Sequence, residues 1–281
     1  MTEGLSNHDL GVPLPLNGRT RLYAILGDPI AQAGSPGLFN RAFKRLGLEA
    51  ALVPMHIKHQ DLNSIIQTFR AVKNFDGLVV TVPHKIALTS CLDEIGKMAQ
   101  RIGAVNAIRK LPDGRLLGDN FDGAGFIEGL RRRKFSVTGK SVLIAGAGGA
   151  GRAVAHSILD EGPSKLAIFD TDTQRTAYLC AELSTYANGS EVTSSEPDAF
   201  GYDVIVNCTS VGMKPSDPLP FKIDRLNQGT LVVDIILEPA LTPLLQKAHA
   251  HGCAIHQGFH MLDGQIDTIC RFFGLTGEQN V

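Results

Sequence analysis

The stretch that decides the fold is Val142-Leu143-Ile144-Ala145 followed by Gly146-Ala147-Gly148-Gly149-Ala150-Gly151. Its apolar run is typical of a buried strand, and the residues from Arg152 onward favour a helix. Gly146, Gly148 and Gly151 match the pattern G-x-G-x-x-G between strand and helix. Glycine lets a backbone approach a pyrophosphate, and a helix N-terminus offers it N–H groups. The stretch therefore predicts a dinucleotide-binding loop, in preference to a structural turn, with cofactor contacts from Gly146, Ala147, Gly148, Gly149 and Ala150.

An acidic residue after the next strand bears on the choice of cofactor. Asp170 follows the apolar run 165–169, about 20 residues after Gly151, where such loops place a ribose-binding carboxylate. A carboxylate there would repel the 2′-phosphate of NADP, by roughly 4 kcal/mol at 4 Å and an effective dielectric constant of 20. Thr171 and Asp172 follow, where an NADP site favours arginine. We therefore expect NAD to be preferred over NADP.

The order of predicted elements defines the fold class. Short apolar runs alternate with helical patterns along most of the 281 residues, which implies parallel sheets with right-handed crossovers. At about 150 residues per domain, the length favours two domains. We predict an α/β chain with a tail at 1–19, an N-terminal α/β domain at 20–118 and a Rossmann-type, doubly wound domain at 119–259. In the first domain we expect a helix capped by Ser35 and another at 91–102.

Composition excludes several classes of protein. The net charge of −1 offers no basic field to a phosphate backbone, which argues against nucleic acid as a partner. No apolar stretch approaches the roughly 20 residues that cross a bilayer, and no secretory signal opens the chain. The five cysteines form no CxxC pair and the nine histidines join no cluster at ligand spacing, so we predict reduced thiols and no metal site. A cytoplasmic location and a monomer or homodimer are expected.

Two segments of the first half offer acid–base chemistry. Lys85 lies just past the apolar run 77–82, and ligands of open α/β sheets bind beyond the carboxyl ends of strands. Asp122 precedes a predicted helix near the domain boundary. A lysine beside a nicotinamide suits alcohol–ketone interconversion, with an aspartate to fix its position. The plainer alternatives are a solvated lysine and a helix N-cap, and we expect His84 to be a solvated turn residue.

The basic run Arg131–Lys134 is interpreted as the C-terminus of a helix rather than as a phosphate site, because cations are favourable there. Cys208 is interpreted as a packing residue, since no histidine pattern marks it as a nucleophile.

Several motifs together resemble the shikimate dehydrogenase family, in that family's order and over about residues 20–274. They are Gly27-Asp28-Pro29-Ile30, Ser35-Pro36, Val80-Thr81-Val82-Pro83-His84-Lys85, Gly103-Ala104-Val105-Asn106, Gly118–Gly123, Gly146–Gly151, Asn207–Met213, Thr242-Pro243-Leu244-Leu245 and Gly258-Phe259-His260-Met261-Leu262 with Gln265. The resemblance implies an active site split between a substrate domain and a Rossmann domain, with the two groups of the catalytic pair meeting across the cleft.

Site residues follow from the same resemblance. It implies that Lys85 and Asp122 are the catalytic pair. Substrate-binding positions are matched by Ser35, Thr81, Asn106 and Gln265, and further cofactor positions by Asn207, Ile235 and Gly258. It also implies that the C-terminal helix, 260–281, packs back on the first domain. The substrate is then a shikimate-like cyclic hydroxy acid, with quinate or an aminoshikimate as alternatives.

The chain departs from the family pattern around the substrate. Ala33 and Val79 stand where the family has serine and asparagine, Leu237 where it has tyrosine, and Phe121 in its Asn-Thr-Asp segment. Each lost polar contact costs on the order of 1–3 kcal/mol of binding. We therefore expect weak activity on shikimate or a differently substituted ring. Two other hypotheses stay open: a non-catalytic, NAD-binding regulatory protein, and a two-domain Rossmann dehydrogenase for an amino acid or a folate.

Overall fold

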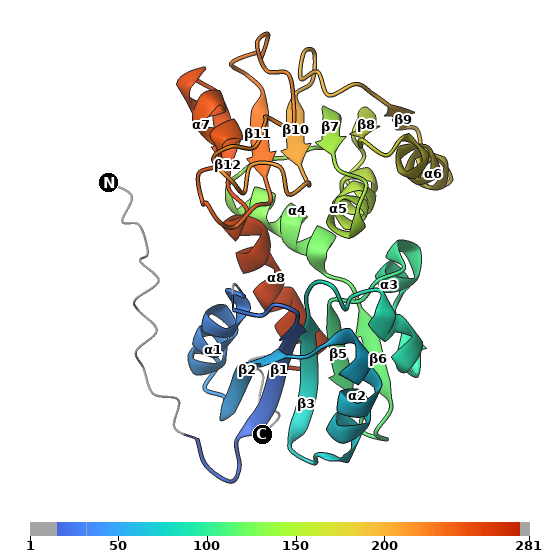
Figure 1. Ribbon diagram of the computed structural model, residues 1–281, viewed down its shortest axis with the longest axis vertical. Coiled ribbons are helices and arrows are strands. Elements are labelled where there is room, and N and C mark those ends of the chain that lie inside the picture. Colours follow the sequence, from blue (N-terminus) through green and yellow to red (C-terminus); the bar gives the residue numbers. More distant parts are fainter. Residues whose placement is uncertain (1–15, 32, 276–281) are drawn as a thin grey trace. The chain divides into compact units, whose positions relative to one another are not determined.

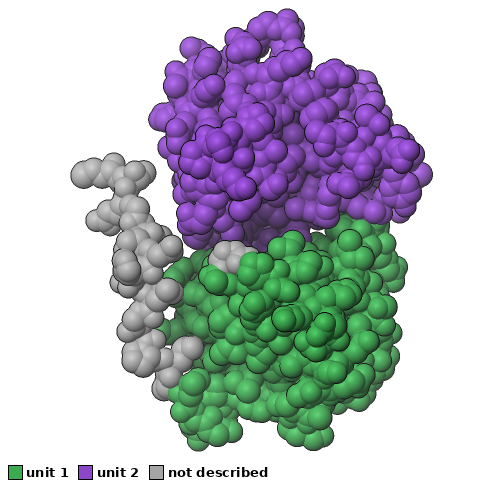
Figure 2. All heavy atoms as spheres, viewed as in Figure 1, with its two compact units in different colours: residues 1–120, 269–281 green, residues 121–268 purple. Residues whose placement is uncertain are grey.

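The computed structural model describes residues 16–31 and 33–275. The chain divides into two compact units, residues 1–120 with 269–281 (unit 1) and residues 121–268 (unit 2) (Figure 2). The sequence predicts a boundary at 118/119 and assigns all of 260–281 to the first domain. In the structure, helix α8 (Phe259–Phe272) has its first ten residues in unit 2. Residues 1–15 of the expected tail and 276–281 of the expected helix lie outside the described residues.

Unit 1 is a six-stranded sheet in the order β2-β1-β3-β5-β6-β4 (Figure 1). Its strands are β1 (Arg21–Gly27), β2 (Ala50–His56), β3 (Phe75–Val80), β4 (Glu94–Ile95), β5 (Ala107–Lys110) and β6 (Leu116–Asp119). Its helices, apart from the end of α8, are α1 (Ser35–Arg45), α2 (Leu62–Ala71), α3 (Lys97–Ile102) and the short 3-10 segments η1 (His59–Asp61) and η2 (Ala87–Cys91).

The sheet of unit 1 is mixed rather than wholly parallel. Strand β5 runs antiparallel to both β3 and β6. Its pairing with β6 follows from the tight turn at Pro112-Asp113-Gly114, where Gly114 takes φ +89°, because this turn joins the two strands directly. A Pro-Asp-Gly segment favours such a turn, whereas strand β6 after it is not expected from the sequence. Because β5 is reversed, its first residues lie at the same edge as the carboxyl ends of β1 and β3.

Two expected helix starts in unit 1 are wrong. The helix expected at 91–102 begins only at Lys97, because β4 precedes it and Gly96 is its N-cap. The N-cap of α1 is Gly34, and no side chain caps the helix, so Ser35 is the first helical residue instead of the cap. Its hydroxyl is therefore not used by the helix terminus.

Unit 2 confirms the Rossmann-type prediction. Its sheet is parallel throughout, in the order β12-β11-β10-β7-β8-β9 (Figure 1). The strands are β7 (Ser141–Ala145), β8 (Lys165–Phe169), β9 (Glu191–Ser194), β10 (Val204–Asn207), β11 (Leu231–Asp234) and β12 (Ala254–His256). The helices, with the first part of α8, are α4 (Asp122–Arg132), α5 (Gly149–Asp160), α6 (Thr173–Ser184) and α7 (Pro243–Ala250).

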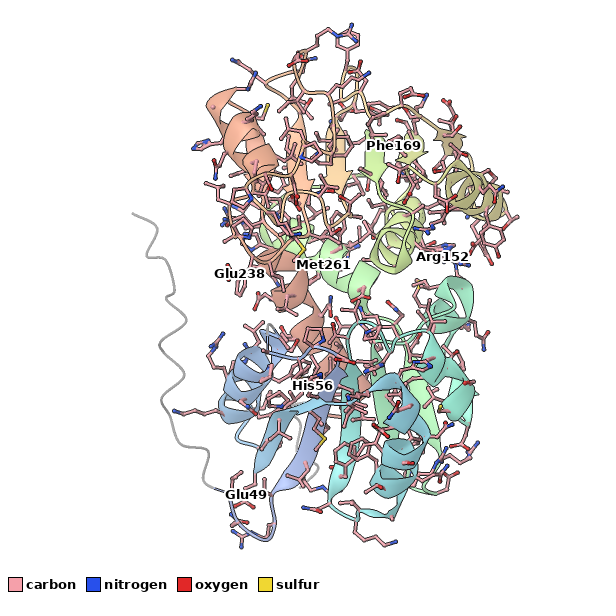
Figure 3. The ribbon with its side chains drawn as sticks, in the orientation of Figure 1. Glu49, His56, Arg152, Phe169, Glu238 and Met261 are labelled. Carbon is pink, nitrogen blue, oxygen red and sulfur yellow. The ribbon has the colours of Figure 1, made fainter. Side chains whose placement is uncertain are left out.

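Alternate residues of the central strand serve the two faces of this sheet. Val142 and Ile144 of β7 pack in one core with helices α4, α5 and α6 and with Met261 of α8, which Figure 3 labels. Leu143 and Ala145 pack in the other with α7. Burial on both faces explains why the strand is a continuous apolar run. Strand order reverses between β7 and β10, so the crevice that binds ligands in such sheets lies beyond their carboxyl ends.

Helices α4 and α8 approach each other closely within unit 2. A Cβ built at Gly125 would lie 2.1 Å from Cγ of Gln265, and one at Gly264 would lie 2.3 Å from the carbonyl oxygen of Gly125. Only glycine permits this crossing. It brings Gln265, from the end of the chain, beside the first turn of α4.

Among the residues that the structure describes, no helix is both long enough and apolar enough to span a bilayer.

Candidate active site

The glycine loop has the geometry that its sequence predicts. Gly146 takes φ +104°, and its N–H donates to the carbonyl of Phe169 at 2.7 Å (Figure 3). A Cβ at Gly151 would lie 1.9 Å from the carbonyl oxygen of Gly146, so the helix and loop pack too tightly for any other residue. Gly148 caps α5, and a Cβ built at Gly148 or Gly149 meets no described atom within 4 Å. The loop is thus open above the N-terminus of α5 and fits a pyrophosphate.

Asp170 holds this loop in place as a charged carboxylate. Its Oδ2 accepts the N–H of Ala147 at 2.7 Å, and its Oδ1 accepts the N–H of Asp172 at 2.9 Å. Burial opposes the charge, but these hydrogen bonds and the Arg175 guanidinium outweigh it and hold the pKa of Asp170 below its ordinary value. The nearest Arg175 nitrogen is 4.0 Å away. An anion therefore stands where the ribose of a dinucleotide lies in such folds.

A buried polar network fixes the loops after β10 and β11. The Asn207 amide donates to both carboxylate oxygens of Asp234, at 3.2 and 3.1 Å, and its oxygen accepts from Thr209. Thr242, which caps α7, donates to Asp234 at 2.8 Å. Burial raises the pKa of Asp234 despite these hydrogen bonds, and its carboxylate adds to the burial that raises the pKa of the Cys208 thiol. The Asn207 side chain thus organises the loop, and Cys208 carries no activated thiol.

Sequence reasoning missed Asp234, and it found Thr242 only as part of the Thr242-Pro243-Leu244-Leu245 motif, without a role. The available signal was an aspartate at the end of an apolar run, followed eight residues later by Thr-Pro before a helix.

The remaining expected cofactor positions lie together at the carboxyl edge of β10, β11 and β12. The N–H of Ile235 donates to the carbonyl of Asn207 at 3.1 Å. A Cβ at Gly258 would lie 2.5 Å from the carbonyl oxygens of Ile235 and Ile236, so the backbone after β12 touches that after β11. Leu237, in place of the family's tyrosine, is 38% exposed.

Asp122 and Gln265 are joined within unit 2. The amide of Gln265 donates to Oδ1 of Asp122 at 3.3 Å, and both residues are buried. Phe121 occupies the N-cap position of α4, so the interpretation of Asp122 as the N-cap is wrong. Asp122 is the first residue of the helix, so its carboxylate lies at the positive end of the helix dipole.

The expected unit 1 residues lie along one sheet edge. Thr81 and Lys85 follow β3, Ser35 follows β1 and begins α1, and Asn106 precedes β5. The backbone of Asn106 bridges strands, because its N–H donates to Asp119 and its carbonyl accepts from Val80. Ser35 and Asn106 are buried, and Lys85 is partly buried rather than a fully solvated lysine.

Two further expectations have clear outcomes. His84 is fully buried, so its interpretation as a solvated turn residue is wrong. The basic run does end a helix: α4 finishes at Arg132, which pairs with Glu128, Asp263 and Asp267. These partners neutralise the Arg132 guanidinium, which agrees with the interpretation of the run as a helix end.

Among the described residues, no group of three or more His, Cys, Asp or Glu side chains is arranged to hold a metal ion.

Two α/β units, a glycine loop at a strand-order reversal and a carboxylate at the end of the next strand define a class of protein: one whose Rossmann unit is built to bind a dinucleotide. Comparison narrows the class. The family model for the shikimate dehydrogenase substrate-binding domain matches residues 25–108. A shikimate dehydrogenase (NADP(+)) of Shouchella clausii is 38% identical over 252 residues, which cover 88% of this chain and 90% of the relative. The chain belongs to the shikimate dehydrogenase family, as the sequence motifs indicate.

Solved structures show how members of this fold vary. The 5-ketofructose reductase of Gluconobacter sp. strain CHM43 has a TM-score of 0.83 at 28% identity, covering 92% of this chain and 94% of that chain. The quinate dehydrogenase of Corynebacterium glutamicum, solved with NAD, has a TM-score of 0.80 at 28% identity, covering 91% and 94%. The α/β fold of both units is therefore confirmed, and the chain is an alcohol-type oxidoreductase.

Proposed function

We propose that this enzyme interconverts a ring hydroxyl and a ketone of a shikimate-like cyclic hydroxy acid, with NAD as the preferred cofactor. Bound NAD would accept the hydride from the carbinol carbon, or NADH would return it to the ketone. Lys85 gives a proton to the ketone oxygen, or takes it from the hydroxyl, and Asp122 fixes the position of the ammonium. The proposal includes the pairing of these two residues, which belong to different units.

The observation that carries this proposal is the Asp122–Gln265 hydrogen bond. A buried carboxylate needs polar partners, and Gln265 supplies one from a helix 143 positions away in sequence. An amide donor beside a carboxylate also suits a hydroxylated ring, because one side chain donates while the other accepts. Ser35, Thr81 and Asn106 supply the remaining polar contacts in the proposal.

The residues expected around the substrate also favour a second candidate substrate. Ala33 replaces a carboxylate-binding serine of the family pattern, and Val79 is a buried strand residue where the pattern has asparagine. The first change removes a contact to the substrate carboxylate, and the second removes a polar contact to the substrate. A neutral polyhydroxylated ketone fits the altered shell, and a structural neighbour is named as a reductase of such a compound, 5-ketofructose.

A substrate panel tests these alternatives. NAD reduction would be measured with shikimate, quinate and an aminoshikimate, and NADH oxidation with 5-ketofructose. We expect turnover on at least one ring hydroxy acid. Turnover on 5-ketofructose alone would replace the proposed substrate class by the neutral one. NAD binding with no turnover on any compound would favour the non-catalytic, regulatory alternative.

Cofactor preference depends on the charge of Asp170. We expect a higher kcat/KM with NAD than with NADP, and we expect Asp170→Asn to lower this ratio about tenfold or more, because the variant loses the repulsion of a 2′-phosphate. Asparagine keeps one oxygen, which can accept the Ala147 N–H, but it loses the second oxygen, which accepts the Asp172 N–H. The Kd of NAD for the variant is therefore measured beside the ratio. The measurement is the ratio of the two kcat/KM values.

Glu191→Gln is the control, because it removes an exposed carboxylate of the same unit that pairs with Lys165. Its ratio should equal that of the unmodified enzyme. A preference for NADP in the unmodified enzyme would refute the role given to Asp170.

A further inference from the structure

The turn that carries Thr81 and Lys85 is tied to its surroundings by backbone hydrogen bonds. The N–H of Thr81 donates to Leu26 at 2.9 Å, and the carbonyl of Val82 accepts from Asp28 at 3.2 Å. The carbonyl of Lys85 accepts the N–H of Val105 at 2.9 Å. These bonds hold the turn against β1 and against the segment before β5.

The side chain of His84 ties the same turn to β2. Its Nε2 lies 2.6 Å from the carbonyl oxygen of Ile57, the residue after His56, which Figure 3 labels at the end of β2. The imidazole is fully buried. Its Nδ1 has no hydrogen-bond partner among the residues that the structure describes.

The hydrogen-bonding role of each ring nitrogen follows from its surroundings. A carbonyl oxygen only accepts, so Nε2 carries the hydrogen of this bond, and Nδ1 is a buried polar atom with no partner among the described residues. A buried polar atom without a partner destabilises a fold, whereas an apolar side chain of the same volume would not. The ring therefore costs stability at one nitrogen and supplies a single directed hydrogen bond at the other.

We propose that His84 is a positioning residue for Lys85, and that its Nε2–H···O=C bond to Ile57 fixes the turn from which the lysine amine acts. The inference rests on the proposed function, because it takes Lys85 as the proton donor. His84 fixes the residue before Lys85, and Val105 fixes the Lys85 carbonyl, so the lysine is held on both sides. Displacing a catalytic group by about 1 Å can cost up to about 10²-fold in rate.

Three variants at His84 distinguish the effect of a donor nitrogen at the right distance from the effect of side-chain volume. The amide nitrogen of His84→Gln is as many bonds from Cα as Nε2, whereas that of His84→Asn is shorter and matches Nδ1. His84→Leu keeps apolar volume and donates nothing. His59→Leu, at an exposed histidine of η1 in the same unit, is the control. Amide hydrogen exchange of Val105 is measured first because it needs no substrate.

We expect faster Val105 exchange in His84→Leu and His84→Asn, and near-original exchange in His84→Gln and His59→Leu. With the best substrate of the panel, kcat should fall about tenfold or more in His84→Leu and His84→Asn, with KM changed less than about threefold, and should largely return in His84→Gln. In a Lys85→Met background, His84→Leu should change the residual rate less than about twofold.

Original kcat in both His84→Leu and His84→Asn would overturn the proposal, and so would equal kcat in His84→Gln and His84→Asn. If His84→Leu does not fold, the comparison of the glutamine and asparagine variants decides. Full activity of Lys85→Met is a different result. It would refute the proposed catalytic role of the lysine, while Val105 exchange still reports whether His84 holds the turn.

Discussion

Lys85→Met is expected to lower kcat/KM about 10³-fold, with little change in the Kd of NAD or in Tm. Methionine keeps the length of the side chain and removes the ammonium, so the proton donor is lost without a cavity. The glycine loop and Asp170 belong to unit 2, and Lys85 belongs to unit 1, so the substitution leaves the residues of the proposed cofactor site unchanged. Steady-state kinetics, calorimetric titration with NAD and thermal unfolding measure the three quantities.

The matched control is Lys58→Met, at an exposed lysine that precedes η1 in the same unit. It removes the same charge from unit 1 and should leave kcat/KM within about twofold, as surface substitutions usually do. Asp122→Asn extends the test because its side-chain oxygen still accepts from Gln265. If both residues act in one step, the double variant should be hardly slower than Lys85→Met. A Lys85→Met enzyme that turns over at the original rate would contradict the mechanism.

The cofactor loop is predictable from the sequence because its constraints are local. Gly146 and Gly151 meet across only a few residues, and the pattern of glycines states directly where side chains have no room. The same holds for the turn at Gly114, since a positive φ at a Pro-Asp-Gly segment depends on three residues. Strand, loop and helix then follow in order, and the Rossmann unit with them.

The errors arise where distant segments decide the outcome. A histidine beside a lysine in a turn suggests a solvated residue, yet His84 is fully buried and hydrogen-bonds to the carbonyl of Ile57, which follows β2. In the sequence, Asp234 is only a residue at the end of an apolar run. In the structure, Asn207 and Thr242 both donate hydrogen bonds to its carboxylate. Serine is a residue type that often caps helices, but in α1 the N-cap is Gly34 and Ser35 is already helical. For His84 and Asp234 the deciding partner comes from a distant segment and not from the local pattern.

The second large effect concerns stability in acid and lies at His256. This residue ends β12 and is 1% exposed, and neither ring nitrogen has a hydrogen-bond partner among the described residues. The ring of His260 lies 4.7 Å away between centroids, and Phe135 packs edge-on at 6.0 Å. Burial first, then the charges of His260 and Arg133, lower the pKa of His256 to about 4. The pKa of His260 is also lowered, chiefly by burial, although Asp263 opposes this.

The sign of the pH dependence follows from this shift. The unfolded chain binds a proton at His256 near pH 6.5, whereas the folded chain does so only near 4. Stability is therefore fully present above about pH 6.5 and is lost as the pH falls towards 4. Between pH 7.5 and pH 5 the loss at this one residue is about 2 kcal/mol. His256→Phe removes the titrating group and keeps a ring of similar shape, so the variant should lose about 2 kcal/mol less over that interval, with His260 responsible for part of the remainder.

The full chain is unfolded with denaturant at pH 7.5 and at pH 5, and the transition is monitored with a probe that reports on unit 2. The difference in the free energy of unfolding between the two pH values is compared for the variant and the unmodified protein. His249→Phe, at an exposed histidine in the last turn of α7, is the control and should follow the unmodified protein at both values of pH. A parallel loss in His256→Phe and the unmodified protein would mean that the buried ring gains a proton in the folded state, which the absence of a hydrogen-bond partner among the described residues opposes. At pH 7.5 the phenylalanine variant should be at least as stable, because the two unpaired nitrogens are gone.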